Sequence, residues 1–367
     1  MSQILVTGGA GFIGSHIVDK LVVLGHTVTI LDNLVSTKGE LPDYINKNAV
    51  FINGDINDKE LLDRIINNFD FIFHEAASVG IAQSNYEIRD FMHNNVTGTA
   101  NLLQSIIDSK CKPKLILSAS NTTYGEGIYN CNSCGDFHAE IRTNNDIMGH
   151  GLEITCPKCH KVCKPIPTPE TTSLNCNSVY ALSKKYQEEL ILFLGKLYNF
   201  PVVILKYFNA FGPRQSLSNP YTGVSAIFTS RIKNNNPIVI YEDGLQTRDF
   251  VYIDDIVQAN ILAMENNSAN YETFNVGSGN PVTIRYIAEK IYELFGKDPN
   301  IELLQKYRNG DIRHCIADNS KIREKLGWAP RVSFDDGIKR LFEWSKDQES
   351  QDNFDKANSK LKEKGLI

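Results

Sequence analysis

A tyrosine and a lysine in one short segment are the first residues of this sequence that suggest catalysis. Tyr180-Ala-Leu-Ser-Lys184 begins a helical pattern over 179–197, and i,i+4 spacing places both side chains on one face of the expected helix. A lysine ammonium beside a phenol favours the phenolate, which predicts a lowered pKa for Tyr180 and a base near neutral pH. The pair also arises by chance in helices, so a surrounding site is needed to support it.

A hydroxyl-rich segment precedes this helix. Ser118-Ala-Ser-Asn-Thr-Thr-Tyr-Gly125 follows an apolar run at 115–118 that we expect to be a strand. Parallel sheets bind ligands at the carboxyl ends of their strands. A hydroxyl here is therefore a candidate for the same site.

Three glycines near the start of the chain indicate a phosphate-binding turn. Residues 7–14 read Thr-Gly-Gly-Ala-Gly-Phe-Ile-Gly, between an expected strand and an expected helix. Glycine lets the backbone turn tightly and approach a pyrophosphate, and the helix N-terminus offers N–H groups to the anion. Asp32 ends the next strand, where a carboxylate binds ribose hydroxyls and repels a 2′-phosphate, which predicts NAD. A simple polar turn at Asp32-Asn33 is the alternative.

Five of the eight cysteines lie between 131 and 163. Cys131-Asn-Ser-Cys134 and Cys156-Pro-Lys-Cys159 are two C-x-x-C pairs, whose four thiolates suit a tetrahedral zinc ion. Such a shell has no open position, so we expect a structural zinc. Unrelated thiols or a redox pair are the alternatives, and the candidate substitute ligands are Cys163, His160 and His138.

The elements that must position these residues alternate between strands and helices. Apolar runs predict strands at 4–7, 27–31, 50–53, 71–74, 115–118 and 202–207, with helical patterns at 13–24, 59–67, 96–108 and 179–197. This alternation predicts an α/β fold with a Rossmann-like doubly wound parallel sheet. The expected parts are an NAD-binding Rossmann domain over 1–125, a zinc-binding insert over 126–170, the catalytic helix and return strand over 171–212, a smaller mixed α/β lobe, mainly substrate-binding, over 213–345, and a charged, solvated helical tail over 346–367.

Composition narrows the class of partner. The chain has 367 residues, 42% of them hydrophobic, with a net charge of 38 − 43 = −5, which argues against a disordered chain and against a nucleic-acid partner. No apolar run approaches the about 20 residues of a membrane span, and the first apolar run meets a glycine turn at once. We expect a cytoplasmic protein without a membrane partner, in which clustered cysteines favour metal over disulfides.

Further motifs carry a family resemblance. In order, they are Gly54-Asp55-Ile56, His74-Glu-Ala-Ala77, Asn95-Val-Thr-Gly-Thr99, Tyr207-Phe-Asn-Ala-Phe-Gly-Pro213, Gly244-Leu-Gln-Thr-Arg-Asp-Phe-Val251, Asn275-Val-Gly277 and Leu326-Gly-Trp328. With the glycines and Tyr180/Lys184, the chain resembles the extended short-chain dehydrogenase/reductase family, specifically its nucleotide-sugar epimerases and dehydratases. The resemblance implies bound NAD, a nucleotide-sugar substrate and a homodimer formed through the helix of Tyr180.

The resemblance also implies residue roles. It assigns catalysis to Ser120, Tyr180 and Lys184. It implies that the cofactor is bound by Gly8, Gly11, Phe12, Ile13, Gly14, Asp32, Asn33, Asp55, Ile56, Ala76, Ala77, Asn95, Ser118, Tyr180, Lys184 and Tyr207. It implies that the substrate is bound by Ser78, Ser120, Asn121, Asn209, Arg248, Arg308 and Asp311. Arginine suits a diphosphate because its planar fork binds phosphate oxygens in pairs, and a surface salt bridge is the alternative for Arg248 and Arg308.

Residues 121 and 122 bear on the reaction. In the family, dehydratases and decarboxylases carry acidic residues here, whereas Asn121 and Thr122 cannot usefully transfer a proton at pH 7. The pattern resembles 4-epimerases, which invert C4 of a nucleotide-hexose through a transient 4-keto sugar, and the insert leading into Pro167-Thr-Pro-Glu170 resembles the subgroup acting on dTDP-L-rhamnose. The alternatives are a dehydratase or oxidoreductase of the family, a UDP-hexose 4-epimerase, and a non-catalytic dinucleotide-sensing protein.

Overall fold

A parallel sheet forms the centre of the molecule. The computed structural model describes residues 1–308 and 310–367. Within them, the sheet has seven strands in the order β13-β9-β5-β4-β1-β2-β3, and every neighbouring pair is parallel. The strands are β1 (Gln3–Thr7), β2 (Thr27–Asp32), β3 (Val50–Asn53), β4 (Phe71–His74), β5 (Lys114–Ser120), β9 (Val202–Tyr207) and β13 (Glu272–Val276). The predicted α/β fold with a large parallel sheet is confirmed.

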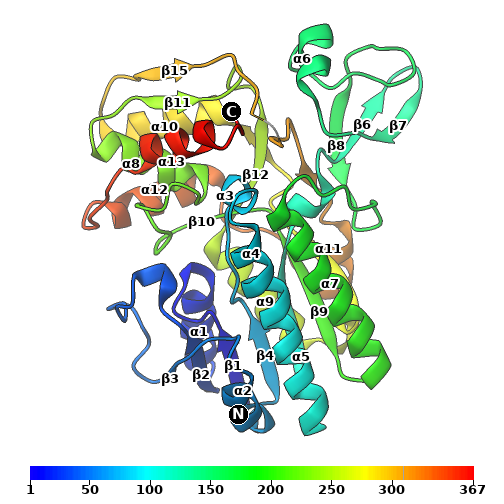
Figure 1. Cartoon of the computed structure of the whole chain (residues 1–367), viewed down its shortest axis with the longest axis vertical. Coiled ribbons are helices and arrows are strands. Elements are labelled where there is room, and N and C mark those ends of the chain that lie inside the picture. The colour runs from blue at the N-terminus through cyan, green and yellow to red at the C-terminus, as the bar shows by residue number, and fades with distance from the viewer. Residues whose placement is uncertain (309) are drawn as a thin grey trace.

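Helices cover both faces of this sheet (Figure 1). Side chains of β1 alternate between the two cores: Ile4 packs in the cluster that includes α1 (Phe12–Val23) and α9 (Ile253–Glu265), whereas Leu5 packs in the other. Burial on both sides explains the continuous apolar runs seen in the sequence. The helices of the second face are α2 (Lys59–Ile65), α5 (Gly98–Ser109) and α7 (Val179–Tyr198).

Short helical segments connect these elements. They are α3 (Ile81–Ser84), α4 (Ile88–Phe91), a π-helix at Met92–Thr97, and 3₁₀ turns at Val35–Thr37, Ile66–Asn68, Asn121–Tyr124 and Asn267–Ala269. A π-helix is rare and is frequently found at functional sites. It separates α4 from α5 and carries Asn95.

A smaller lobe follows β9. Its helices are α8 (Val224–Lys233), α10 (Ile284–Phe295), α11 (Ser320–Leu326) and α12 (Phe334–Ser345). Its strands form one sheet of β10 (Asn209–Phe211), β12 (Thr247–Tyr252) and β14 (Pro281–Thr283) and one pair of β11 (Ile238–Ile240) and β15 (Ile301–Leu303). Between these elements the chain returns to the central sheet with α9 and β13, so the two lobes share the segment after residue 213.

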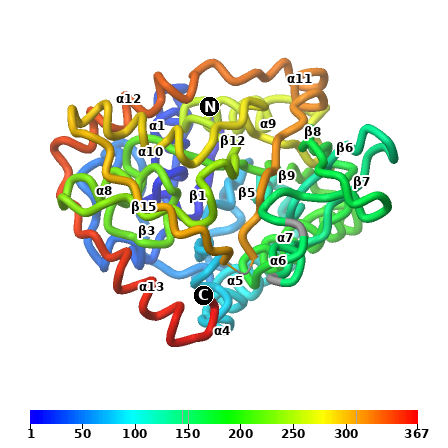
Figure 2. The backbone as a smooth tube through the Cα atoms, turned by 90° about the horizontal axis from the view of Figure 1, so that it is seen from above, coloured from blue at the N-terminus to red at the C-terminus, as the bar shows by residue number. Residues whose placement is uncertain are grey.

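The segment 126–170 is more ordered than its weak periodicity indicates. It contains β6 (Ile128–Cys131), β7 (Gly135–His138), α6 (Asn144–His150) and β8 (Lys164–Thr168), and it projects to one side of the molecule (Figures 1 and 2). Its sheet has the order β16-β8-β6-β7, in which β16 (Ile316–Ala317) comes from the smaller lobe. The insert is thus joined to that lobe through the backbone.

The composition of the charged tail predicted a solvated helix, but part of this helix is buried against the rest of the molecule. Helix α13 (Phe354–Glu363) buries Ala357 and Leu361, and the Lys360 ammonium pairs with Glu87 at 3.1 Å. Figure 1 shows α13 beside α8 and α12 of the smaller lobe. An apolar i,i+4 pair within a polar segment is enough to dock the helix.

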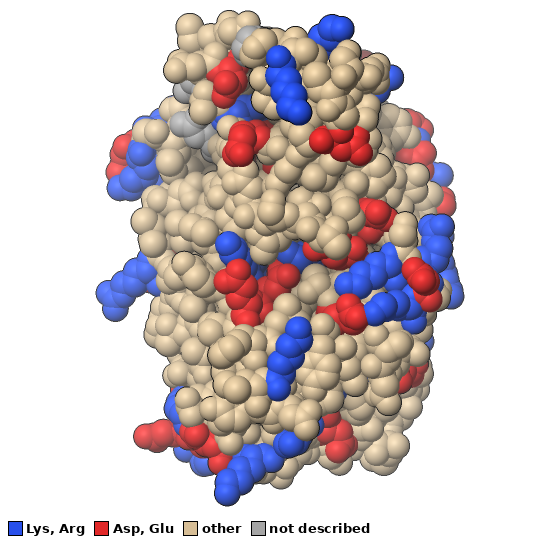
Figure 3. All heavy atoms as spheres, turned by 90° about the vertical axis from the view of Figure 1, so that its right-hand side faces the viewer, with Lys and Arg blue, Asp and Glu red and all other residues tan. Residues whose placement is uncertain are grey.

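The surface mixes the two signs of charge. Figure 3 shows lysine and arginine interspersed with aspartate and glutamate on the side of the molecule that carries α7 and the insert. Among the described residues, no helix combines the length and the apolarity that crossing a bilayer requires.

Candidate active site

The glycine turn has the close approach that the sequence predicts. A Cβ at Gly14 would lie 2.3 Å from the carbonyl oxygen of Gly8, and one at Gly8, which has φ +69, would lie 2.7 Å from the nitrogen of Ala76. Both contacts are with backbone, which cannot move aside. Helix α1 therefore begins directly against the ends of β1 and β4, with Phe12 and Ile13 in its first turn.

Asp32 lies beside this turn. Its carboxylate accepts hydrogen bonds from the N–H of Ala10 at 3.0 Å and of Leu34 at 2.8 Å. Burial raises the pKa of Asp32, and the two N–H groups oppose the shift. Asn33 donates to Asp55 at 2.7 Å, and Ile56 packs next to them, so these four predicted cofactor residues share one rim.

The π-helix holds a buried amide at the next strand end. Asn95 accepts from the N–H of Ser78 at 2.7 Å and donates to the Ser183 hydroxyl at 2.9 Å. It thereby joins the loop after β4, which carries Ala76 and Ala77, to α7. Asn95 belongs to a motif that was recognised in the sequence, whereas nothing in the sequence around Ser183 indicated that its hydroxyl would bind this amide.

The three predicted catalytic residues meet at the end of β5. Ser120 lies close enough to Tyr180 for its hydroxyl to act against the raised pKa of the phenol, and Thr122 donates to the Ser120 oxygen at 2.9 Å. The Lys184 ammonium donates to the carbonyl of Ser118 at 2.8 Å. The capping serine Ser178 accepts from the N–H of residue 181 at 3.1 Å and so fixes the first turn of α7.

The pKa of Tyr180 differs from the prediction. Burial raises it to about 12, and the hydrogen bond from Ser120 opposes the shift. The physical reason is that Lys184 is drawn to other groups, since its ammonium binds the Ser118 carbonyl and is attracted by Glu75. Burial lowers the pKa of Lys184, and Glu75 opposes this.

Glu75 is a candidate functional residue to which the sequence analysis assigned no role. It accepts from the Tyr207 hydroxyl at 3.3 Å, and that hydroxyl accepts from Asn260 at 2.7 Å. Burial raises the pKa of Glu75, and Lys184 acts in the opposite direction. The sequence offered one signal that could have identified Glu75 as a site residue, namely its position directly after an apolar strand.

The predicted substrate residues lie where the smaller lobe faces these strand ends. Arg248, on β12, donates to the carbonyls of Thr247 at 2.7 Å and Arg313 at 3.3 Å. Arg308 pairs with Asp311 at 2.9 Å, so the salt-bridge alternative describes its present partner. The remaining predicted residues are Ser78 after β4, Asn121 after β5 and Asn209 on β10.

The four predicted metal ligands converge. The sulfur atoms of Cys131, Cys134, Cys156 and Cys159 all lie within 4.8 Å of one another, which fits a tetrahedral zinc shell. Of the substitute candidates, Cys163 donates to the Lys161 carbonyl at 3.3 Å and the His138 ring contacts the Tyr124 carbonyl at 2.7 Å.

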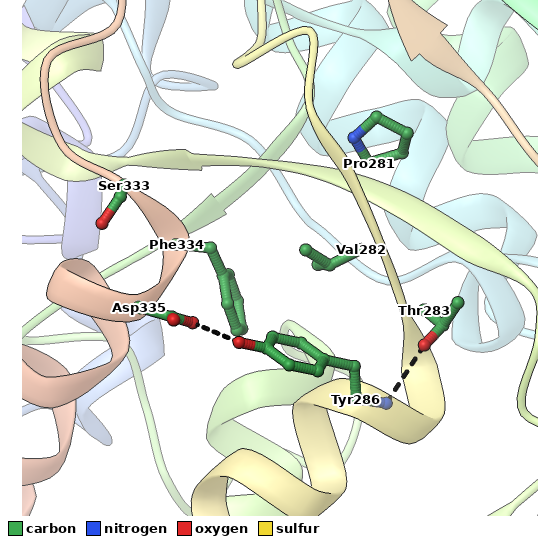
Figure 4. A pocket seen from close by; sticks show the side chains of 7 residues that line it. All are labelled: Pro281, Val282, Thr283, Tyr286, Ser333, Phe334 and Asp335. Atoms are coloured by element: carbon green, nitrogen blue, oxygen red, sulfur yellow. Dashed lines mark hydrogen bonds between the residues drawn. The ribbon is translucent and has the colours of Figure 1, made fainter.

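A separate hollow on the smaller lobe has a volume of about 440 Å³ (Figure 4). The Tyr286 hydroxyl donates to Asp335 at 2.8 Å, and the Thr283 hydroxyl accepts from the Tyr286 N–H at 3.1 Å. Thr283 thus caps the N-terminus of α10, and Tyr286 and Asp335 pair with each other across the hollow. The lining residues are Pro281, Val282, Thr283, Tyr286, Ser333, Phe334 and Asp335.

Comparisons with known proteins agree with this architecture. The model of the NAD dependent epimerase/dehydratase family matches residues 4–146, and that of GDP-mannose 4,6 dehydratase matches 162–341. A putative UDP-glucose 4-epimerase of Methanocaldococcus jannaschii is 33% identical over 94% of this chain and 98% of its own length. A UDP-N-acetyl-alpha-D-glucosaminuronate decarboxylase of Bacillus cytotoxicus is 30% identical over 94% of this chain and 98% of its own length. A dTDP-L-rhamnose 4-epimerase of Burkholderia thailandensis is 30% identical over 93% of this chain and 94% of its own length.

Solved structures give the same result. The UDP-glucose 4-epimerase of Thermotoga maritima with UDP-glucose superimposes with a TM-score of 0.77, at 35% identity over 94% of this chain and 98% of the other. That of Thermus thermophilus, complexed with NAD, has a TM-score of 0.76, at 28% identity over 95% and 100%. The fold is that of NAD-dependent nucleotide-sugar epimerases and dehydratases. The chain belongs to the NAD-dependent epimerase/dehydratase family, as its motifs predict.

Proposed function

We propose that the chain is an NAD-dependent nucleotide-sugar 4-epimerase. The observation that carries this proposal is the composition of the catalytic cluster. Ser120, Tyr180 and Lys184 lie together, while the neighbouring positions 121 and 122 hold an amide and a hydroxyl. Elimination of water needs a further acid and base, whereas epimerisation needs one group that takes and returns a single proton.

The residues of the chain divide the work as follows. Bound NAD supplies a reversible hydride acceptor at C4 of the sugar. Tyr180 removes the O4 proton, and Ser120, at the end of β5, orients the hydroxyl or relays the proton. Lys184 keeps a positive charge next to this group, which favours the phenolate against the effect of burial. After the 4-keto sugar has rotated in the pocket, Tyr180 would return the proton to O4, and the hydride supplied by the cofactor would enter on the opposite face of C4.

This mechanism requires the nucleotide to be held more firmly than the sugar. Arg248 and Arg308 are our candidates for the diphosphate, because guanidinium groups bind phosphate oxygens in pairs. Binding energy concentrated there leaves the hexose free to rotate. The cofactor stays bound through the cycle, since no net oxidation occurs.

Our first choice of substrate is dTDP-L-rhamnose. The cysteine insert and the segment Pro167-Thr-Pro-Glu170 support it, and the Burkholderia relative acts on that sugar by name. UDP-hexoses are the nearest alternative, because the Methanocaldococcus relative is equally well covered.

We also infer a structural zinc ion and a homodimer. Four thiolates leave no open coordination position, so the metal would hold the knuckles of the insert together. Helix α7 exposes an apolar face at 4- and 7-residue spacings, and a second copy of the chain is the occupant that would bury it. Its members are Leu182, Tyr186, Phe193 and Leu197, each at least 40% exposed.

The test is product analysis without added cofactor. The purified protein is incubated separately with dTDP-L-rhamnose, UDP-glucose and UDP-N-acetylglucosamine, and the products are examined by NMR and mass spectrometry. Unchanged mass with inverted C4 proton coupling supports epimerisation and identifies the sugar. Loss of mass would show dehydration or decarboxylation and would refute the reading of positions 121 and 122.

A further inference from the structure

A buried ion network joins the cysteine insert to the smaller lobe. Arg142, in the insert, pairs through Nε with Glu126 at 3.0 Å and through Nη2 with Glu242 at 2.9 Å. The three side chains are only 4%, 0% and 2% exposed. Charges at such depth are stable only when they are well paired, so their geometry is closely determined.

A second buried arginine extends the network. Arg313 is fully buried, and its guanidinium pairs with Glu242 at 2.8 Å and with Asp243 at 2.7 Å. Its backbone N–H donates to Glu126 at 2.6 Å, and its Nε donates to Glu153 of the insert at 3.1 Å. The insert therefore holds Arg313 by both its main chain and its side chain.

The network also contacts the residues on either side of Arg308, one of the two diphosphate candidates. Arg142 donates from Nη2 to the Asp311 carbonyl at 3.2 Å and accepts at its own carbonyl from the Tyr307 hydroxyl at 2.8 Å. Its guanidinium also stacks 5.0 Å above the Tyr307 ring. These contacts hold Tyr307 and Asp311, which lie on either side of Arg308 in the chain.

The other candidate arginine is held through the same network. Arg248 donates to the carbonyl of Arg313 at 3.3 Å, and Arg313 is held by the insert. Burial lowers the pKa of Arg248, and the nearby carboxylates oppose the shift. Four carboxylates face two guanidinium groups in the network, so an excess of negative charge lies beside Arg248.

We propose that Arg142 is a positioning residue for the nucleotide diphosphate, through which the cysteine insert sets the placement of Arg248 and Arg308. This inference rests on the proposed function, because it requires those arginines to bind phosphate. An insert that only protruded from the fold would not need a buried arginine reaching across to Tyr307 and Asp311. The planar guanidinium is suited to the task because it binds two carboxylates and a carbonyl at fixed angles.

The test is a comparison of binding and turnover in substituted full-length protein. Arg142→Met removes the charge and Arg142→Lys keeps it without the fork. Tyr307→Phe removes the hydroxyl that donates to the Arg142 carbonyl and accepts from the N–H of Gly310. The control is Arg231→Lys, since Arg231 is a similarly buried arginine that pairs with Asp352 at 3.3 Å. Affinity for UDP and dTDP is measured by calorimetry, with bound NAD and thermal stability measured in the same samples.

We expect Arg142→Met to raise the Kd of the nucleoside diphosphate and the KM of the sugar nucleotide by about tenfold. Arg142→Lys should restore part of this loss, and Tyr307→Phe should show a smaller loss. Bound NAD and kcat should change little, which a general loss of stability would not reproduce. The control should bind as the unsubstituted protein does.

Equal affinity in folded Arg142→Met and unsubstituted protein would overturn the inference and leave the proposed function intact. If Arg142→Met does not fold, unchanged affinity in both Arg142→Lys and Tyr307→Phe overturns it instead. Failure of the unsubstituted protein to bind either nucleotide would overturn the inference and the proposed function together.

Discussion

Replacing Glu75 by glutamine tests the electrostatics of the site. Glutamine keeps the size of the side chain and an oxygen that can accept from the Tyr207 hydroxyl, which lies 3.3 Å from the carboxylate. It removes the negative charge that opposes the effect of burial on Lys184. The lysine should then lose its proton at a lower pH.

The size of the effect follows from the arrangement. An opposite charge within about 4–6 Å shifts a pKa by about 1–3 units. Glu75 and Lys184 are each hydrogen-bonded to a different neighbour, Tyr207 and Ser118, so we take the lower limit of about one unit, or about 1.4 kcal/mol. Since catalysis requires charged Lys184, activity falls as the pH rises through its pKa, and the substitution moves this fall to lower pH.

The assay is the pH dependence of kcat/KM for the sugar nucleotide, which reports the free enzyme. Two neighbours titrate far from the alkaline limb, because burial lowers the pKa of His74 to about 3 and raises that of Tyr180 to about 12. Glu87→Gln, at a carboxylate that pairs with Lys360 at 3.1 Å, is the control and should leave the profile unchanged. An alkaline limb that stays in place or moves to higher pH in Glu75→Gln would refute the reasoning.

Four further predictions concern separate parts of the molecule. Tyr180→Phe should lower kcat by about 10²–10⁴-fold without weakening UDP or dTDP binding in calorimetry; retained turnover would exclude Tyr180 as the base. Gly14→Ala should release NAD and lower the melting temperature, because its Cβ would lie 2.3 Å from the Gly8 oxygen; NAD content after denaturation checks this. The chain should bind one zinc ion, and Cys134→Ser should reduce that content in elemental analysis. Phe193→Asp should produce monomers in light scattering, because Phe193 is 62% exposed on the proposed interface.

Much of the catalytic site was predictable because its signals are local. A glycine turn between a strand and a helix and a Tyr–Lys pair one helical turn apart are patterns of a few residues. The C-x-x-C pairs are likewise short, and their four sulfur atoms lie together as predicted. Strands buried on both faces contain continuous apolar runs, so β1, β5 and β9 could be located from the runs at their centres.

What the tertiary structure decided depends on residues far apart in the chain. The direction of the Tyr180 pKa shift was mispredicted, because the sequence cannot show that burial outweighs a lysine bound to Ser118. The contact of Arg142 with Glu242 spans 100 residues, and no local pattern pairs two such positions. Charge interactions act through space and depend on burial, whereas propensity and spacing act along the chain. The sequence by itself therefore determined the strands and helices of the central sheet and the motifs. Only the fold decided the order within the insert and which charged groups face the motifs.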